Sequence, residues 1–413
     1  MVAIFILLAM LFKLPIGVSL ALSALAGSLL GGEGLALRHL VEGSFGYFDT
    51  ILIILTAMLF MKVLQASGIL DTITALLLRT FYRRKLLLLL TVMLLIIFPG
   101  MITGSSTASI LSTGPIVAPV LLKLGLSRPK TAALITMGGI LGMIAPPVNI
   151  LVMIMGGGVD MPYAGITLPL LIIVIPTAVA TSLWLAAKEI KAIGYEQMMA
   201  ILPESLGKKY GFRLYLPLLT MFVLMVGPNV MVKVIPDIGI PAIFLLSSLV
   251  GLSSGRPFNF FKITQKAIGE SLPIVSILAG VGMFVQVMTL TGARGWLVIS
   301  VLSLPSLLLY LGISVSMPLL GGISSFGSAS ILGVPFILAL INKNAVLTSS
   351  ALSAITSLGD LVPPSAIACR FAAQVVNEPN FFKVLRQCLI PALFQLAMGL
   401  GVLLLASFID KII

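Results

Sequence analysis

Residues 85–123 constrain the fold most, because a single membrane-spanning helix cannot contain them. Two apolar arms lie between basic ends and meet at the polar stretch GSST, residues 104–107, in the sequence KLLLLLTVMLLIIFPGMITGSSTASILSTGPIVAPVLLK. One helix of about 37 residues would be near 55 Å long, whereas the hydrocarbon core of a bilayer is about 30 Å thick. Because glycine and serine are poor helix formers, we predict a re-entrant hairpin that turns at GSST and returns to its own side.

A second segment repeats this pattern. Residues 305–342 are again apolar, then rich in Gly and Ser, then apolar, and TASIL at 107–111 matches SASIL at 328–332. Each predicted hairpin is followed by an apolar helix that a proline pair interrupts, over residues 131–155 and 346–376. Paired broken helices within an internal repeat are typical of secondary transporters.

The composition places this pattern in a membrane. With 59% hydrophobic and 9% charged residues, the chain is predicted to be an all-α polytopic membrane protein whose surroundings are the lipid bilayer. Most of the 25 Lys and Arg lie in short links between apolar runs, so the net charge of +12 indicates topology rather than a nucleic-acid partner. Other apolar runs predict helices at 2–12, 14–31, 49–67, 163–187, 214–231, 239–253, 268–290 and 387–409, and surface arms at 69–84 and 293–303.

These segments divide into two predicted repeats, residues 1–187 and 214–413, joined by a polar connector at 188–213. Each repeat would cross the membrane an odd number of times, which gives the two repeats inverted topology. The excess of basic residues in the predicted inner links favours entry of the first hairpin from the cytoplasm and of the second from outside.

A hairpin that stops within the membrane leaves backbone groups without partners, so polar ligands are expected at its tip. Sodium ions suit the carbonyl ends and hydroxyls, whereas an anionic substrate group suits the N–H ends. The predicted oxygens come from residues 104–107 and 322–325, from Ser109, Ser328 and Ser330, and from the backbone around Gly142, Ile144, Ala145, Gly359, Asp360 and Val362. The alternative is that these small residues only allow close helix packing.

Three further polar residues fall at predicted membrane depth, namely Asn149, Asp360 and Arg370. Polar side chains at that depth are usually functional. Arg370 could balance Asp360 or a substrate carboxylate, although ten residues of helix would separate the two by about 15 Å. The predicted substrate contacts are Ser106, Thr107, Asn149, Ser325, Ser328 and Arg370.

Three stretches carry a resemblance to a known family: LPIGVSLALSALAGSLLGG, MITGSSTAS and GLSRPKTAALITMGGILGMIAPPVNI. They resemble the large membrane subunit of TRAP-type transporters, the DctM-like branch of the ion transporter superfamily, well over residues 1–187 and more weakly after 214. The resemblance implies an elevator-type importer of a dicarboxylate or sugar acid, coupled to sodium, in a prokaryotic cytoplasmic membrane. It places sodium at Ser105, Ser106, Gly142 and Ala145, and at Ser324, Ser325, Gly359 and Val362, to which Asp360 is added by its position.

The same resemblance implies two partners, a small membrane subunit and a soluble substrate-binding protein, and no organic cofactor. However, the family usually carries acidic residues after the first tip serines and in the second tip, where this chain has Ser109 and no acid before Asp360. A stand-alone carboxylate carrier, coupled to protons or sodium, is therefore an alternative, and whether the chain forms a homo-oligomer stays open.

Two other classes compete with a carrier. A channel would differ in its flux, which does not saturate at carrier rates. An intramembrane aspartyl protease is suggested by Leu358-Gly359-Asp360, but that chemistry needs two carboxylates that share a proton. No second acid is predicted at mid-membrane depth, so the chain is expected not to be an enzyme.

Overall fold

The computed structural model describes residues 1–191, 195–230, 236–340 and 342–409, and all regular structure in this part of the chain is helical. Six helices in it are long and apolar enough to cross a membrane, which confirms a multi-pass membrane protein. Small parts of the predicted connector, second hairpin and second repeat (192–194, 341, 231–235 and 410–413) lie outside the described residues. The six candidate spans are Leu37–Ala66, Lys85–Thr103, Thr167–Ala186, Gly207–Pro228, Phe260–Leu290 and Phe381–Leu404.

The first half contains the predicted hairpin at the predicted place. Its arms turn at Gly104, whose φ of +64° is the left-handed conformation that glycine adopts without strain. Residues 32–48, which separate the helices predicted at 14–31 and 49–67, hold a further helix, because Gly43 packs directly on the backbone of Gly282 and Arg38 pairs with Glu42 one turn later at 2.7 Å. The helices are α1 (Val2–Met10), α2 (Ile16–Leu30), α3 (Leu37–Ser44), α4 (Phe48–Ala66), α5 (Ile69–Phe81), α6 (Lys85–Thr103), α7 (Ser106–Lys123), α8 (Arg128–Ile144), α9 (Ile150–Gly157) and α10 (Thr167–Ala186).

The second half shows the same order of arm, hairpin, broken helix and final helix. Two of its helices begin earlier than predicted, because Asn259 and Asn380 cap them by accepting hydrogen bonds from the backbone N–H groups of Lys262 and Phe382. The helices are α11 (Tyr195–Met199), α12 (Gly207–Tyr210), a 3₁₀ turn (Gly211–Tyr215), α13 (Leu216–Val230), α14 (Ile240–Gly251), α15 (Phe260–Leu290), α16 (Ala293–Leu302), α17 (Ser306–Gly321), α18 (Ser325–Ser328), a π-helical turn (Ala329–Gly333), α19 (Val334–Ala339), α20 (Ala345–Ser357), a 3₁₀ turn (Leu358–Leu361), α21 (Ile367–Val375), α22 (Phe381–Leu404) and α23 (Ala406–Ile409).

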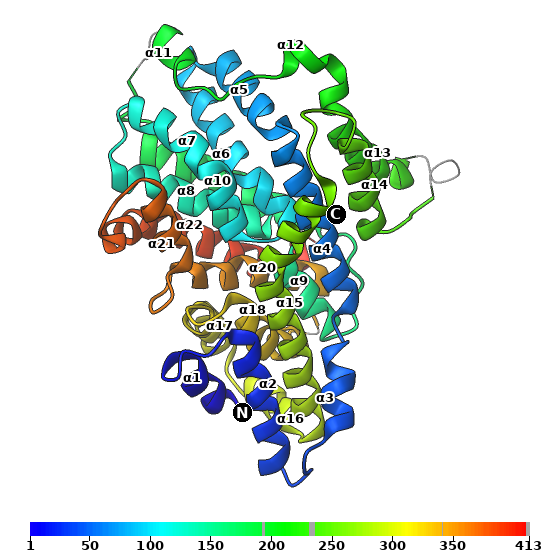
Figure 1. Ribbon diagram of the computed structural model, residues 1–413. Helices are drawn as coiled ribbons and strands as arrows, with labels where there is room; N and C mark the ends of the chain where they lie inside the picture. The colour runs from blue at the N-terminus through cyan, green and yellow to red at the C-terminus, as the bar shows by residue number, and fades with distance from the viewer. Residues whose placement is uncertain (192–194, 231–235, 341, 410–413) are drawn as a thin grey trace.

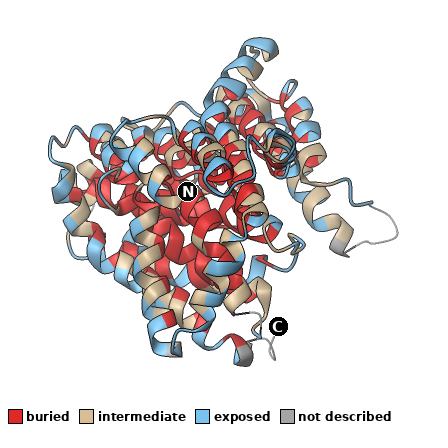
Figure 2. Cartoon of the chain, turned by 90° about the horizontal axis from the view of Figure 1, so that it is seen from below, coloured by how far each residue is buried: buried red, intermediate tan, exposed pale blue. Residues whose placement is uncertain are grey.

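The two hairpins extend toward the middle of the molecule from opposite ends (Figure 1). The pair α6–α7 lies on the side of α5, α11 and α12, whereas α17 lies toward the end that holds α1, α2 and α16. The broken helices α8 and α20 form much of the buried interior, which Figure 2 shows in red. The long helix α15 packs on α2, α3 and α4, so these four helices form a wall beside the hairpins.

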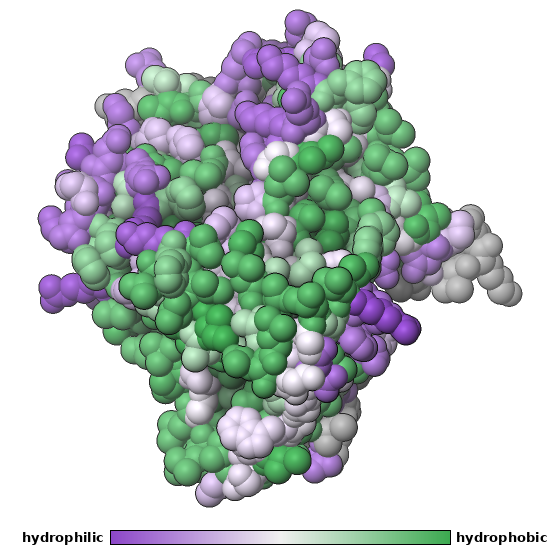
Figure 3. Space-filling model, turned by 60° about the horizontal axis from the view of Figure 1, so that its bottom comes forward, coloured by the Kyte–Doolittle hydropathy of each residue, from purple (hydrophilic) through white to green (hydrophobic). Residues whose placement is uncertain are grey.

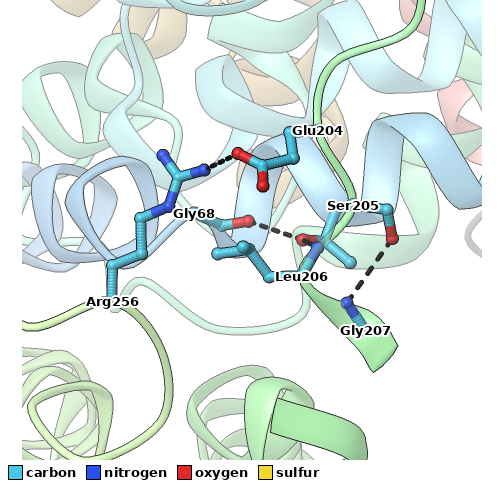
Figure 4. A network of polar contacts seen from close by, with 7 residues as sticks. Gly68, Glu204, Ser205, Leu206, Gly207 and Arg256 are labelled. Atoms are coloured by element: carbon cyan, nitrogen blue, oxygen red, sulfur yellow. Dashed lines mark hydrogen bonds and ion pairs between the residues drawn. The ribbon is translucent and has the colours of Figure 1, made fainter. Parts of the chain in front are cut away.

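The connector is fixed to the end of the wall (Figure 4). Arg256 contacts the carboxylate of Glu204, and its backbone N–H donates to the carbonyl oxygen of Ser67 at 3.0 Å. The backbone N–H of Leu206 donates to Thr72 Oγ1 at 3.0 Å. These contacts tie the connector to the α4–α5 corner and to the loop before α15.

The outer surface matches a bilayer environment. Figure 3 shows hydrophobic residues over most of the visible face and hydrophilic residues mainly along its upper and left margins, with a smaller group at the right. Large apolar side chains such as Trp296, Leu307 and Phe222 are more than half exposed. In water such a surface would be unfavourable, whereas lipid covers it without cost.

Candidate functional site

The two hairpin tips have the same local construction. Ser105 caps α7 by accepting a hydrogen bond from the Ala108 N–H at 3.3 Å, and Ser324 caps α18 by accepting from the Gly327 N–H at 3.1 Å. Capping by serine is favourable because the first N–H groups of a helix have no partner within it. The next residue in each tip begins the helix and is free to direct its hydroxyl elsewhere.

Both of those hydroxyls reach one carboxylate. Ser325 Oγ donates to Asp360 Oδ1 at 2.7 Å, and Ser106 Oγ donates to Asp360 Oδ2. Asp360 lies in the 3₁₀ turn after α20 and is only 9% exposed. Sequence position suggested Asp360 as part of the second sodium site alone, whereas the fold places it between both tips.

Each hairpin is held to its own broken helix by a contact between glycines. A Cβ atom added to Gly100 would lie 2.8 Å from the Cα of Gly142, and one added to Gly359 would lie 2.4 Å from the Cα of Gly321. Only glycine permits backbones to approach so closely. Gly142 and Gly359 are predicted sodium ligands, whereas Gly100 and Gly321, the glycines shortly before each tip, have no predicted role.

The helix breaks are also joined to the hairpins by hydrogen bonds. The Val148 N–H donates to the carbonyl oxygen of Met101 at 3.1 Å, and Ser365 Oγ donates to that of Gly322 at 2.6 Å. Of the predicted sodium ligands, the carbonyls of Gly142 and Gly359 each accept a backbone N–H three residues later. A carbonyl oxygen has two lone pairs, so such a bond leaves one lone pair for a cation.

The side-chain oxygen and nitrogen of Asn149 both form hydrogen bonds within the protein. Its Oδ1 accepts from the Val152 N–H at 3.1 Å, and its Nδ2 donates to the carbonyl oxygen of Ile144 at 3.1 Å and to Ser353 Oγ at 3.0 Å. These bonds cap α9 and satisfy the end of α8. Ser328 likewise donates to the carbonyl oxygen of Met317 at 2.8 Å.

A cavity of about 800 Å³ lies between the hairpin tips and the wall, which lines it with residues of α2, α4 and α15. Of the residues predicted as substrate contacts or sodium ligands, six line it, namely Ser105, Ser106, Thr107, Ser324, Ser325 and Asp360. Those that do not line it are Gly142, Ala145, Asn149, Ser328, Gly359, Val362 and Arg370.

Arg370 lies away from the cavity. It is exposed, donates to the carbonyl oxygen of Pro364 at 2.9 Å and stacks 4.8 Å from the centre of the Phe381 ring. The opposite wall instead supplies three charged residues that sequence analysis did not assign to a site: Lys62, Lys266 and Glu270.

Comparison with known proteins agrees with this architecture. Residues 2–186 match the model of the Na⁺/H⁺ antiporter family. The YdaH transporter of Alcanivorax borkumensis is similar in structure, with a TM-score of 0.65 at 18% identity, over 96% of this chain and 98% of that one. The chain has a transporter fold.

A second solved structure supports the same conclusion. MtrF of Neisseria gonorrhoeae, described as illuminating a class of antimetabolite efflux pumps, has a TM-score of 0.59 at 12% identity, over 89% of this chain and 83% of that one. No curated protein matches the chain. These likenesses are to transporters other than the large TRAP subunit, so the TRAP assignment stays a prediction.

Proposed function

We propose that the chain is a cation-coupled secondary transporter that moves a small organic anion through the cavity between the hairpin tips, in a prokaryotic cytoplasmic membrane. The observation that carries the proposal is the carboxylate of Asp360 shared by Ser106 and Ser325. Two acids among the described residues line the cavity, and of these Asp360 contacts the tips whereas Glu270 lies on α15. An ionisable residue at membrane depth usually marks an ion path.

The coupling cation would bind at this carboxylate. The tips offer hydroxyl oxygens and the turn offers a carboxylate, a set of hard oxygen donors that suits sodium. A sodium ion at Asp360 would compete for the oxygens that now accept from the two serines. Cation binding and the link between the hairpins would therefore be coupled.

Alternating access would follow from movement of the hairpins as one body. We take residues 1–187 and 214–413 as inverted repeats whose hairpins and broken helices move together against the wall of α2, α3, α4 and α15. The glycine contacts and the bonds at Val148 and Ser365 support this grouping, since they join each hairpin to its own broken helix. The motion would be of the elevator type.

Exchange of Na⁺ for H⁺ is a second candidate, favoured by the family match over residues 2–186. In that case Asp360 would carry either cation alternately, and no organic substrate would be needed.

Transport by the purified chain in proteoliposomes tests both functions. An imposed sodium gradient should drive uptake of a radiolabelled carboxylate in the absence of any other subunit. Sodium-driven proton movement without a carboxylate would favour exchange instead. A chain that moves neither, and responds only when a soluble binding protein is added, would support the TRAP reading.

Ser106→Ala and Ser325→Ala are each expected to raise the sodium concentration for half-maximal uptake by roughly tenfold. Each change removes one hydroxyl oxygen from the set of donors that would coordinate sodium beside Asp360, and a loss of about 1.4 kcal/mol in binding corresponds to a tenfold change. Ser365→Ala serves as a control, because Ser365 also lines the cavity but donates to Gly322. Unchanged sodium dependence in both tip variants would contradict the assignment.

Cysteines at positions 127 and 303 are expected to react with a membrane-impermeant thiol reagent from opposite sides of the membrane. Ser127 follows the first hairpin and Ser303 precedes the second, and both are exposed. The two native cysteines, Cys369 and Cys388, are buried, so the unsubstituted chain provides the background. Labelling of both positions from one side would refute the inverted arrangement.

A further inference from the structure

Across the cavity from Asp360, the wall carries charges that no packing requirement explains. Lys62 lies on α4, within a candidate membrane span, and its side chain is 12% exposed. Its Nζ lies 2.6 Å from Glu270 Oε2 on α15. Lys266 lies one helical turn before Glu270 on the same face of α15, and all three residues line the cavity.

The ion pair of Lys62 and Glu270 lowers the stability of the fold unless it has a role in binding. Removal of a lysine from water carries a desolvation penalty that its partner offsets only in part. Replacement of both members of such a pair by apolar residues is often neutral or stabilising. Glu270 lines the cavity and its side chain is 42% exposed, so it is a counter-ion that can leave Lys62 at little cost.

We propose that Lys62 and Lys266 form an anion-binding subsite and that the ligand is a small monocarboxylate with an apolar body, whose carboxylate replaces Glu270 on Lys62. This inference rests on the proposed function and deepens it. It places anion recognition on the wall helices and cation recognition at the hairpin tips.

The charges in the cavity determine how many anionic groups it accepts. When Asp360 is ionised, the positive charges of the two lysines equal the negative charges of Asp360 and Glu270. Once a cation occupies Asp360, one positive charge remains, which matches one carboxylate. Binding of the cation therefore favours binding of the anion, as coupled transport requires.

The uncharged side chains that line the cavity determine what the ligand carries besides its carboxylate. Much of it is apolar, including Met58, Met61, Ile274, Ile277 and Phe326. The hydroxyls of a sugar acid would lose water against such side chains without gaining partners, and a dicarboxylate would need a second free cation. The volume of about 800 Å³ lies within the usual range for small-molecule sites.

Four six-carbon probes separate these properties: hexanoate, hexanamide, adipate and gluconate. Binding to the purified full chain should be measured by calorimetry, in sodium and in potassium. Hexanoate is expected to bind best, and more tightly in sodium, whereas hexanamide and gluconate should bind at least tenfold more weakly. Equal binding of hexanoate and hexanamide would overturn the proposal.

Single substitutions test whether Lys62 and Lys266 bind the carboxylate. Lys62→Gln and Lys266→Gln should each weaken hexanoate binding at least tenfold, whereas Lys262→Gln, an exposed change on α15 outside the cavity lining, should not. Glu270→Gln adds one net positive charge and should favour adipate relative to hexanoate. If Lys62→Gln fails to fold, Lys266→Gln and Glu270→Gln still decide the question.

Radiolabelled sodium exchange distinguishes this inference from the proposed function. The wild type should show sodium exchange without any probe, because Asp360 and the tip serines form the proposed cation site. Wild-type binding of hexanoate that survives both lysine changes overturns the subsite alone. Sodium exchange without binding of any probe also overturns it, whereas loss of sodium response in the wild type would overturn the proposed function as well.

Discussion

Asp360→Asn is expected to abolish the dependence of transport on a sodium or proton gradient while the protein still folds. Asparagine has the shape of aspartate, and its amide can still bond to both tip serines, because a serine hydroxyl can donate to Oδ1 or accept from Nδ2. The link between the hairpins is therefore kept, and only the charge is lost. A neutral amide cannot carry a proton and binds sodium weakly, so gradient-driven uptake should fall by at least a hundredfold.

Sodium-driven uptake in proteoliposomes measures this effect, and the melting temperature in detergent reports on folding. Asp71→Asn is a suitable control, since Asp71 lies on the arm α5 and does not line the cavity. In the wild type, protons and sodium should compete for Asp360, so the sodium requirement should increase as the pH falls. The variant should show no such competition, and a variant that keeps it would remove Asp360 from the coupling site.

The hairpins could be predicted from sequence because their signals are local. The first hairpin was placed at 85–123, and α6 and α7 span the same residues, since two apolar arms of fixed length must turn where Gly and Ser interrupt them. The proline pairs marked both helix breaks for a similar reason. A proline removes a backbone donor and disfavours a helical conformation before it, whatever the rest of the chain does.

The shared carboxylate could not be predicted in the same way. Ser106 and Asp360 are 254 residues apart, and no local pattern relates them. The depth of a residue in the membrane can be estimated from its position in a span, but the direction in which its side chain faces cannot. That is why Asn149 and Arg370 were expected in the site, whereas Lys62, on a span of the same kind, was left without a role.

Gly359→Ala is expected to lower the free energy of unfolding by more than about 3 kcal/mol. The added Cβ would lie 2.4 Å from the Cα and 2.5 Å from the carbonyl carbon of Gly321, so backbone rather than a flexible side chain would have to move. Overpacking of a core commonly costs about 1–3 kcal/mol, and a contact between two backbones leaves less room for adjustment. A large fall in melting temperature in detergent would show the effect.

Gly312→Ala is the matched control, because Gly312 lies on α17 with Gly321 and an added Cβ meets nothing within 4 Å. It should be neutral or stabilising by up to about 1 kcal/mol, as expected for glycine replaced by alanine within a helix. Gly321 ends α17 three residues before Ser324, so any separation from Gly359 also moves the tip away from Asp360. Folded Gly359→Ala protein should therefore respond weakly to sodium. Wild-type melting with a wild-type sodium response would show that the glycine contact does not position the tip.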